Sequence, residues 1–122
     1  MGFLHRFFNR LENAFQYSFH GYRATFKEEA AFRQIILLVL VLSVVAGVLS
    51  ISPVERALLI IPLGISVIVE LLNSAIENVV NLASPKLHPF AKKAKDMGSA
   101  AQLTALVLIG VVWIMVLWNH FW

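Results

Sequence analysis

Two glutamates lie inside an apolar stretch of the chain, where a charged side chain is costly. From Ala57 the sequence reads ALLIIPLGISVIV and then continues as ELLNSAIENVVNL, so the hydrophobic pattern persists while one side becomes acidic and amidic. A helix turns by roughly 100° per residue, and four polar residues therefore fall within about 80° of one another on one face: Glu70, Asn73, Glu77 and Asn81. Ionisable groups at membrane depth commonly mark a functional site. We therefore expect this face to bind a cation or to accept a proton.

Other charged residues stand at the ends of the two neighbouring apolar stretches. Glu28 and Glu29 precede the first stretch, and Lys95, Asp96 and Ser99 stand at the start of the last one. Carboxylates from two helices suit a hard cation such as Mg²⁺, which takes oxygen ligands and leaves room for phosphate oxygens. A lysine beside them suits a transferring phosphate. The pattern thus predicts a cation site at one membrane surface, with a lysine that faces phosphate.

Several polar residues also have simpler interpretations. Lys92 and Lys93 can contact anionic lipid headgroups, Glu28 can face water, and Asn73 can form a hydrogen bond between helices. The histidines share no metal-ligand spacing, and we interpret all four as surface residues: His5, His20, His88 and His120.

The motifs of soluble kinases and of thiol chemistry do not occur in the sequence. Neither GxxxxGK[ST] nor GxGxxG is present, and the six glycines are scattered along the chain. The chain has no cysteine, which excludes disulfides, thiolate metal sites and a cysteine nucleophile. The residue types and spacings alone therefore do not identify ATP as a ligand.

The composition indicates that the elements carrying these residues are solvated by lipid. The chain has 122 residues, of which 59% are hydrophobic and only 14% are charged. A chain this short has a high ratio of surface to volume and cannot hide so many apolar side chains from water. We therefore expect a single all-α membrane domain over residues 1–122.

Three apolar stretches are long enough to cross a hydrocarbon core ~30 Å thick as helices. A Ser52-Pro53 turn and a basic loop separate them, and the last stretch has only Gln102 and Thr104 as strongly polar interruptions. The first uninterrupted apolar run begins at Ile35, so no cleavable signal peptide is expected. The predicted spans cover residues 29–51, 56–82 and 94–118.

Residues 1–27 differ from the three spans because they form an amphipathic pattern. Phenylalanine, leucine and tyrosine side chains recur at spacings of three and four, and arginines lie off that stripe. Such a helix lies in the plane of the membrane interface. The alternative is a packing helix of a soluble core, for which the chain offers no other soluble partner.

The distribution of basic residues predicts the orientation. Of the ten lysines and arginines, five precede the uninterrupted apolar run that begins at Ile35, one lies between the first and second apolar runs, four lie between the second and third, and none follows the third. By the positive-inside rule the N-terminus is cytoplasmic and the C-terminus is periplasmic. Topology thus explains the net charge of +3, and we expect no nucleic-acid partner.

Three motifs in order resemble those of the small integral-membrane diacylglycerol kinases of Gram-negative bacteria. They are Glu29-Ala-Ala-Phe-Arg-Gln34, Glu70-Leu-Leu-Asn-Ser-Ala-Ile-Glu77 and Ala94-Lys-Asp-Met-Gly-Ser-Ala100, and the resemblance covers essentially the whole chain. It implies a homotrimeric bundle in the bacterial inner membrane, with active sites shared between protomers. The implied reaction transfers the γ-phosphate of MgATP to diacylglycerol and yields phosphatidic acid.

The resemblance also implies roles for individual residues. Glu29 and Glu77 hold Mg²⁺ on the nucleotide phosphates, Glu70 is the general base on the lipid hydroxyl, and Asn73 supports Glu70. The implied ATP-binding residues are Arg10, Tyr17, Glu29, Glu77, His88, Lys95 and Asp96. The implied lipid-binding residues are Arg10, Ser18, Phe19, Arg23, Ala31, Gln34, Arg56, Glu70, Ser99, Trp113 and Trp118.

Two features depart from the Gram-negative pattern, and they leave alternatives open. Asn81 stands where that pattern has an acidic residue, and the stretch from Ser84 to Pro89 resembles Gram-positive relatives that phosphorylate undecaprenol. Undecaprenol is therefore the alternative substrate. The same carboxylates would also fit a small cation transporter or channel subunit, although residues 57–69 carry almost no polar side chain that could continue an ion pathway. A non-catalytic membrane scaffold is the third alternative.

Overall fold

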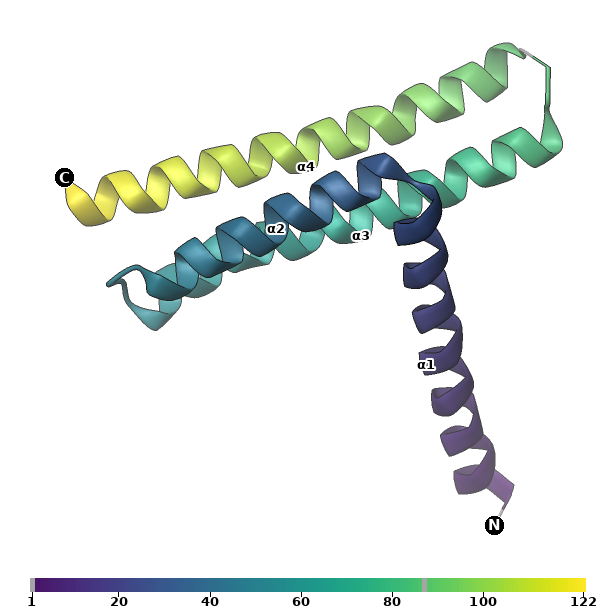
Figure 1. Ribbon diagram of the computed structural model, residues 1–122, viewed down its shortest axis with the longest axis horizontal. Coiled ribbons are helices and arrows are strands. Elements are labelled where there is room, and N and C mark those ends of the chain that lie inside the picture. Colours follow the sequence, from purple (N-terminus) through teal and green to yellow (C-terminus); the bar gives the residue numbers. More distant parts are fainter. Residues whose placement is uncertain (1, 87) are drawn as a thin grey trace.

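The computed structural model describes residues 2–86 and 88–122, and these residues form four helices and no strand (Figure 1). The helices are α1 (Gly2–Glu28), α2 (Ala30–Val48), α3 (Pro53–Ala83) and α4 (Pro89–Phe121). Helices α2, α3 and α4 are each long and apolar enough to cross a membrane. The predicted all-α fold with one amphipathic helix and three apolar helices is thus confirmed.

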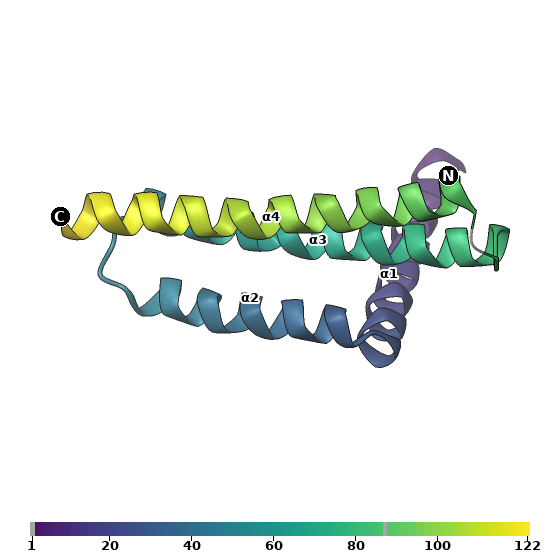
Figure 2. The same ribbon diagram turned by 90° about the horizontal axis from the view of Figure 1, so that it is seen from above.

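The three apolar helices form an antiparallel bundle. Helices α3 and α4 run side by side along their lengths in both views, and α2 packs against α3 (Figures 1 and 2). Helix α1 joins the bundle at the start of α2 and projects away from it (Figure 1). We call this end of the bundle the elbow end, and we call the opposite end, where α2 leads into α3, the turn end.

The junction between α1 and α2 is a sharp elbow at one residue. Glu29 has extended backbone angles, with φ −121° and ψ 116°, so the helix is interrupted there. The Arg33 guanidinium donates hydrogen bonds to the carbonyls of Phe26 at 2.7 Å and Lys27 at 3.1 Å, which satisfies the end of α1. No described residue of α1 is buried, as expected for a helix whose aromatic stripe lies in a membrane interface.

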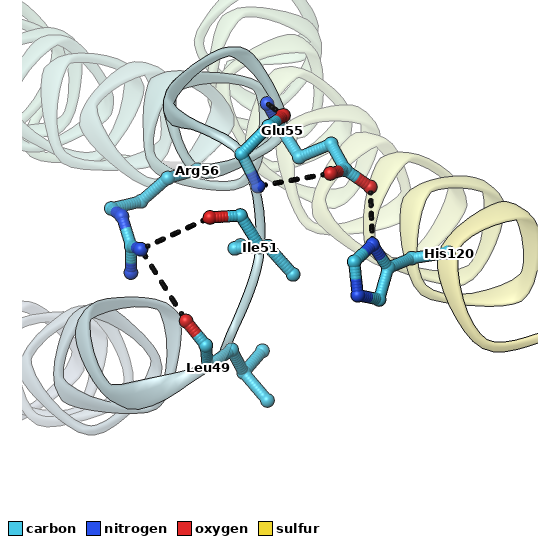
Figure 3. A network of polar contacts seen from close by, with 6 residues as sticks. Leu49, Ile51, Glu55, Arg56 and His120 are labelled. Atoms are coloured by element: carbon cyan, nitrogen blue, oxygen red, sulfur yellow. Dashed lines mark hydrogen bonds and ion pairs between the residues drawn. The ribbon is translucent and has the colours of Figure 1, made fainter.

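The turn end has a complete set of capping interactions. Ser52 and Glu55 form a capping box at the start of α3, and Pro53 occupies the first turn of that helix, where a missing N–H costs nothing. The Arg56 guanidinium donates to carbonyls at the end of α2 and in the turn: those of Ala46, Gly47, Leu49 and Ile51. Figure 3 shows the bonds to Leu49 and Ile51. These caps explain why α2 ends at Val48, before residue 51, and why α3 begins at Pro53, before residue 56.

Helix α4 starts at Pro89, earlier than the span predicted from residue 94. His88 is the residue before the helix, and its Nδ1 accepts a hydrogen bond of 3.1 Å from the backbone N–H of Phe90. Because of this cap, α4 begins about one turn before the predicted apolar span, and this additional turn carries lysines. Helix α4 ends at Phe121, beyond the predicted boundary of 118.

The buried core changes character along the bundle. Towards the turn end it is apolar and contains Ala46, Leu59, Leu63, Ile109 and Trp113. The Trp113 indole N–H donates to the Leu59 carbonyl at 3.0 Å, so even its one polar group is satisfied. Towards the elbow end, polar side chains are buried beside Phe32 and Ile35: Glu70, Ser74 and Gln102. The polar part of the core therefore lies where the sequence predicts a site.

Candidate functional site

A cavity of about 520 Å³ opens between α2, α3 and α4 near the elbow end. Its polar lining is Glu29, Glu70, Asn73, Glu77, Ser99 and Gln102, and its apolar lining is Ala30, Ala31, Leu103 and Leu106. We call it the glutamate cavity. It brings together the predicted base, its supporting amide, both predicted metal ligands and two further predicted lipid-binding residues. Of the predicted polar face of α3, Glu70, Asn73 and Glu77 therefore line one cavity, whereas Asn81 does not line it.

The deepest acid of the cavity is Glu70, of which only 5% is exposed. Glu29 reaches the same cavity from the elbow, where its carboxylate accepts a hydrogen bond from the buried Ser74 hydroxyl of α3. Because this bond crosses from the elbow to α3, it orients the Glu29 side chain towards the cavity. A carboxylate oriented in this way is suited to act as a ligand.

A glycine on α4 makes room for the amide of Asn73. A Cβ atom built on Gly98 would collide with the Asn73 Oδ1 atom, so α3 and α4 can approach this closely only where α4 has no side chain. The Oδ1 atom is buried and has no hydrogen-bond partner in the described part of the chain. Gly98 therefore positions Asn73, a role that the sequence motifs do not predict.

Gln102 is a second residue of the cavity that the sequence motifs do not assign to the site. It is 8% exposed, and neither its amide nitrogen nor its amide oxygen has a hydrogen-bond partner among residues 2–86 and 88–122. The signal was present in the sequence, because Gln102 follows Ser99 by three residues and so shares its face of the third span. A polar residue in an apolar span on the face of a predicted site residue is itself a site candidate.

The cavity fits a phosphate-bound magnesium ion better than a metal held by protein alone. In residues 2–86 and 88–122 no three His, Asp or Glu side chains gather closely enough to enclose an ion. Mg²⁺ does not need such a cage, since it is commonly held by one or two carboxylates with water and substrate phosphates. Glu29 and Glu77 supply two carboxylates on one cavity wall. The donor set therefore matches an ion that arrives with a nucleotide.

Three of the predicted nucleotide-binding residues line a smaller cavity between the ends of α3 and α4. This cavity of about 190 Å³ contains His88, Lys95 and Asp96, and Asn81 lies on its wall. Asp96 forms an ion pair of 2.7 Å with Lys92. Lys95 is half-buried in the same cavity.

The remaining predicted nucleotide-binding residues lie elsewhere in the chain. Arg10 lines a shallow cavity on α1 with Phe3, Arg6 and Phe7, and Tyr17 is exposed on the same helix. Neither residue lines the glutamate cavity or the cavity that contains Lys95. One chain by itself therefore does not assemble the full set of predicted ATP-binding residues.

The predicted lipid-binding residues are distributed along the molecule, from α1 and the elbow to the turn end. Phe19 and Arg23 line a cavity of about 820 Å³ between α1 and α2, while Ser18 and Gln34 are exposed nearby in the sequence. Ala31 and Ser99 line the glutamate cavity. Glu70 lines the same cavity, and Arg10 lies on α1. The last three lie towards the turn end: Arg56, Trp113 and Trp118.

Two of the residues towards the turn end already have partners within the chain. Arg56 binds backbone carbonyls and Trp113 binds the Leu59 carbonyl, so both stabilise the bundle whatever else they contact. Trp118 is exposed and stacks on Trp122, with ring centroids 5.7 Å apart. An exposed aromatic pair at a helix end is typical of a membrane interface.

Comparison with known proteins gives a consistent result. Residues 16–117 match the family model described as prokaryotic diacylglycerol kinase. The chain is 53% identical to the diacylglycerol kinase of Pseudomonas aeruginosa over 88% of each chain. It is 47% identical to that of Helicobacter pylori strain 26695, over 87% of this chain and 83% of the relative. It is 44% identical to that of Escherichia coli K12 over 93% of each chain.

Proposed function

Because the chain belongs to the prokaryotic diacylglycerol kinase family, we propose that it is an ATP-dependent lipid kinase that phosphorylates diacylglycerol. The single structural observation that best supports this function is the glutamate cavity. A buried carboxylate, two further carboxylates and unpartnered amides line one space within a membrane bundle. Phosphate transfer to a lipid hydroxyl needs a base for the hydroxyl proton next to ligands for the phosphate-bound cation, and carboxylates suit both tasks.

Glu70 is the proposed general base. Its carboxylate takes the proton of the lipid hydroxyl while the hydroxyl oxygen attacks the γ-phosphorus, and the bond from that phosphorus to ADP breaks. Its burial among apolar helices keeps water away from the reacting phosphate, which favours transfer to lipid over hydrolysis. Asn73, held against Gly98, is placed to support the Glu70 carboxylate on the same helix face.

Glu29 and Glu77 are the proposed ligands of Mg²⁺ that enters with ATP. When bound, the ion neutralises charge on the phosphate oxygens. Glu29 is oriented for this role by the Ser74 hydroxyl. Glu77 lies two turns from Glu70 on the same face, on the elbow side of the base, so the phosphates enter from that side.

The remaining nucleotide contacts are proposed to come from two protomers of a homotrimer. Lys95, Asp96 and His88 lie at the elbow end of α3 and α4 of one chain, whereas Arg10 and Tyr17 lie on α1, which leads away from that bundle (Figure 1). A helix that projects from its own bundle can complete a neighbouring site. The separation of these two groups in one chain supports a shared active site.

The lipid substrate is proposed to enter along α1 at the membrane interface. Phe19 and Arg23 line a largely apolar cavity beside α2, which suits an acyl chain below a polar head group. The proposed path then passes Ala31 and Ser99, which line the glutamate cavity. Gln34 and Trp118 are exposed to the surrounding membrane. We place the protein in the bacterial inner membrane, as its family implies. The distribution of basic residues supports an orientation with the elbow end cytoplasmic and the C-terminus periplasmic.

A competition assay tests the substrate. Purified protein in detergent micelles receives MgATP with diacylglycerol and undecaprenol at equal mole fraction, and the phosphorylated lipids are separated. We expect phosphatidic acid as the main product, and no ADP without a lipid alcohol. Undecaprenyl phosphate as the main product would contradict the substrate. Cation flux in liposomes without nucleotide and without kinase activity would instead indicate a channel, and neither activity would indicate a scaffold.

A further inference from the structure

Gln102 presents two buried hydrogen-bonding atoms that make no hydrogen bond of normal geometry within residues 2–86 and 88–122. The residue is 92% covered, lines the glutamate cavity and lies beside the Glu70 carboxyl group. A buried amide without partners is destabilising. A ligand that supplies a hydrogen-bond partner for such an amide in an apolar span therefore recovers this free energy when it binds.

The register of α3 and α4 places this amide at the level of the proposed base. Gly98 contacts Asn73, and further along the pair Trp113 contacts Leu59, as expected for antiparallel helices in constant register. Between these two contacts, Gln102 stands opposite Glu70. The amide is thus within one side-chain length of the position where an acceptor hydroxyl must lie to lose its proton.

Gln102 can also reorient at little cost. An amide that makes no hydrogen bond has none to break when its side chain rotates. The residue faces the cavity between α3 and α4, so its partner must be a group that enters this cavity. The partner has to be a hydrogen-bond acceptor or donor on a molecule that fits between Glu29, Glu70 and Ser99.

We propose that Gln102 donates a hydrogen bond to an ester carbonyl of the glycerolipid and thereby selects diacylglycerol over alcohols that lack esters. The inference rests on the proposed function. Diacylglycerol carries ester carbonyls a few bonds from its hydroxyl, whereas a polyprenol carries the hydroxyl alone. An amide N–H is a donor with the right chemistry for such a carbonyl. A site built to hydrogen-bond a substrate group discriminates against analogues that lack this group.

The test compares a diester with a diether substrate. Wild-type protein and the Gln102→Leu and Gln102→Met variants are assayed with dioleoylglycerol and with the dioleyl diether of glycerol, which has the same chains and hydroxyl but no carbonyl. Both variants keep the approximate volume and remove the hydrogen bond. The matched control is Thr104→Val on the same helix, because Thr104 lies outside the glutamate cavity and donates to the Ala100 carbonyl.

We expect wild-type protein to prefer the diester by about tenfold in kcat/KM, since one hydrogen bond to a buried amide discriminates by roughly that factor. The preference should fall close to one in both Gln102 variants and remain in Thr104→Val. Equal loss on both substrates, or loss of oligomeric assembly in the variants, would overturn the inference, because Gln102 would then act through packing or a partner subunit. If wild-type protein phosphorylates neither lipid, the proposed function itself fails. If it phosphorylates both equally, only the role of Gln102 fails.

Discussion

The two ends of the bundle differ in whether their polar side chains have hydrogen-bond partners. At the turn end, the polar side chains of Ser52, Glu55, Arg56 and His120 all have partners within the chain (Figure 3). At the elbow end, Asn73 Oδ1 and both polar atoms of Gln102 have no partner among the residues that the structure describes. Partnered polar groups fix a structure, whereas buried unpartnered groups are costly unless a ligand satisfies them. The turn end therefore has the character of a scaffold, and the elbow end is the candidate site.

Burial alone would not have separated the two ends. Trp113 and Gln102 are buried to a similar extent on the same helix, but the Trp113 indole reaches a carbonyl and the Gln102 amide does not. The difference predicts that substitutions at the turn end mainly change stability, while substitutions at the elbow end mainly change catalysis. Each of the following experiments tests one side of this contrast.

The largest expected effect is on catalysis at the elbow end. Glu70→Gln removes the proposed base but keeps the shape of the side chain, so we expect kcat to fall by about 10³-fold, or roughly 4 kcal/mol of transition-state stabilisation. The melting temperature should not fall, because an uncharged amide is easier to bury than a carboxylate. Rates of phosphatidic acid formation and thermal melts in detergent measure both quantities.

Glu28→Gln is the matched control for this variant. Glu28 precedes Glu29 but is exposed on α1, and it does not line the glutamate cavity. Its substitution should leave kcat near the wild-type value. A Glu70→Gln protein that retains a tenth or more of wild-type turnover would remove Glu70 from the chemistry.

The second effect is on stability at the turn end. Arg56→Met keeps the length of the side chain but removes the donor to the carbonyls of Gly47, Leu49 and Ile51, among others. Hydrogen bonds to a charged donor contribute roughly 1.5–3 kcal/mol, so we expect a loss of about 2 kcal/mol in unfolding free energy with kcat unchanged. Arg6→Met is the control, because Arg6 donates only within the exposed helix α1, to Gly2.

This variant also decides between two roles for Arg56. The sequence resemblance implies contact with the lipid substrate, which predicts a raised KM for diacylglycerol. The structure shows a capping role, which predicts lowered stability alone. An increase in KM with an unchanged melting temperature would contradict the capping role and would bring the turn end into the substrate path.

The fold and the centre of the site could be predicted from the sequence because both depend on helical periodicity. Apolar length gives the three spans, and the spacing of Glu70, Asn73 and Glu77 gives one face, whatever the helices pack against. Glu29 could be added because topology brings the start of the first span to the same level. These inferences need only local geometry and the order of the spans.

Pairwise contacts between helices could not be predicted in this way. The roles of Gly98 and Gln102 depend on the register of α3 against α4. The family resemblance assigns Arg56 to the lipid, whereas its cap on α2 depends on the fold of the turn. His120 is exposed, as the sequence predicts, but its pairing with Glu55 joins residues that are far apart in the sequence. Sequence periodicity does not specify such contacts.

A third, smaller effect tests the register at the elbow end. Gly98→Ala places a methyl group where Asn73 Oδ1 lies, so either the amide rotates or the helices separate. We expect kcat to fall by about tenfold, and a loss of stability of about 1–2 kcal/mol, typical of overpacking. Gly110→Ala on the same helix is the control, because a Cβ atom there meets nothing within 4 Å.

A double substitution shows whether the loss of activity passes through Asn73. If Gly98→Ala acts by displacing the amide, adding it to Asn73→Ala should cause little further loss of kcat. Full additivity of the two losses would show that Gly98 acts independently of Asn73. Gly98 would then only allow the two helices to pack closely.

The smallest effect returns to the turn end, where Glu55 and His120 are 3.0 Å apart and both partly covered (Figure 3). The pair joins the start of α3 to the end of α4, and a double-mutant cycle of Glu55→Gln and His120→Gln should give a small favourable coupling. Glutamine at position 55 can still accept the Ser52 backbone N–H, so the cycle isolates the contact with His120 from the capping box. Melting temperatures of the four proteins measure the coupling, with His20→Gln on α1 as the control. A coupling of zero would remove His120 from the scaffold.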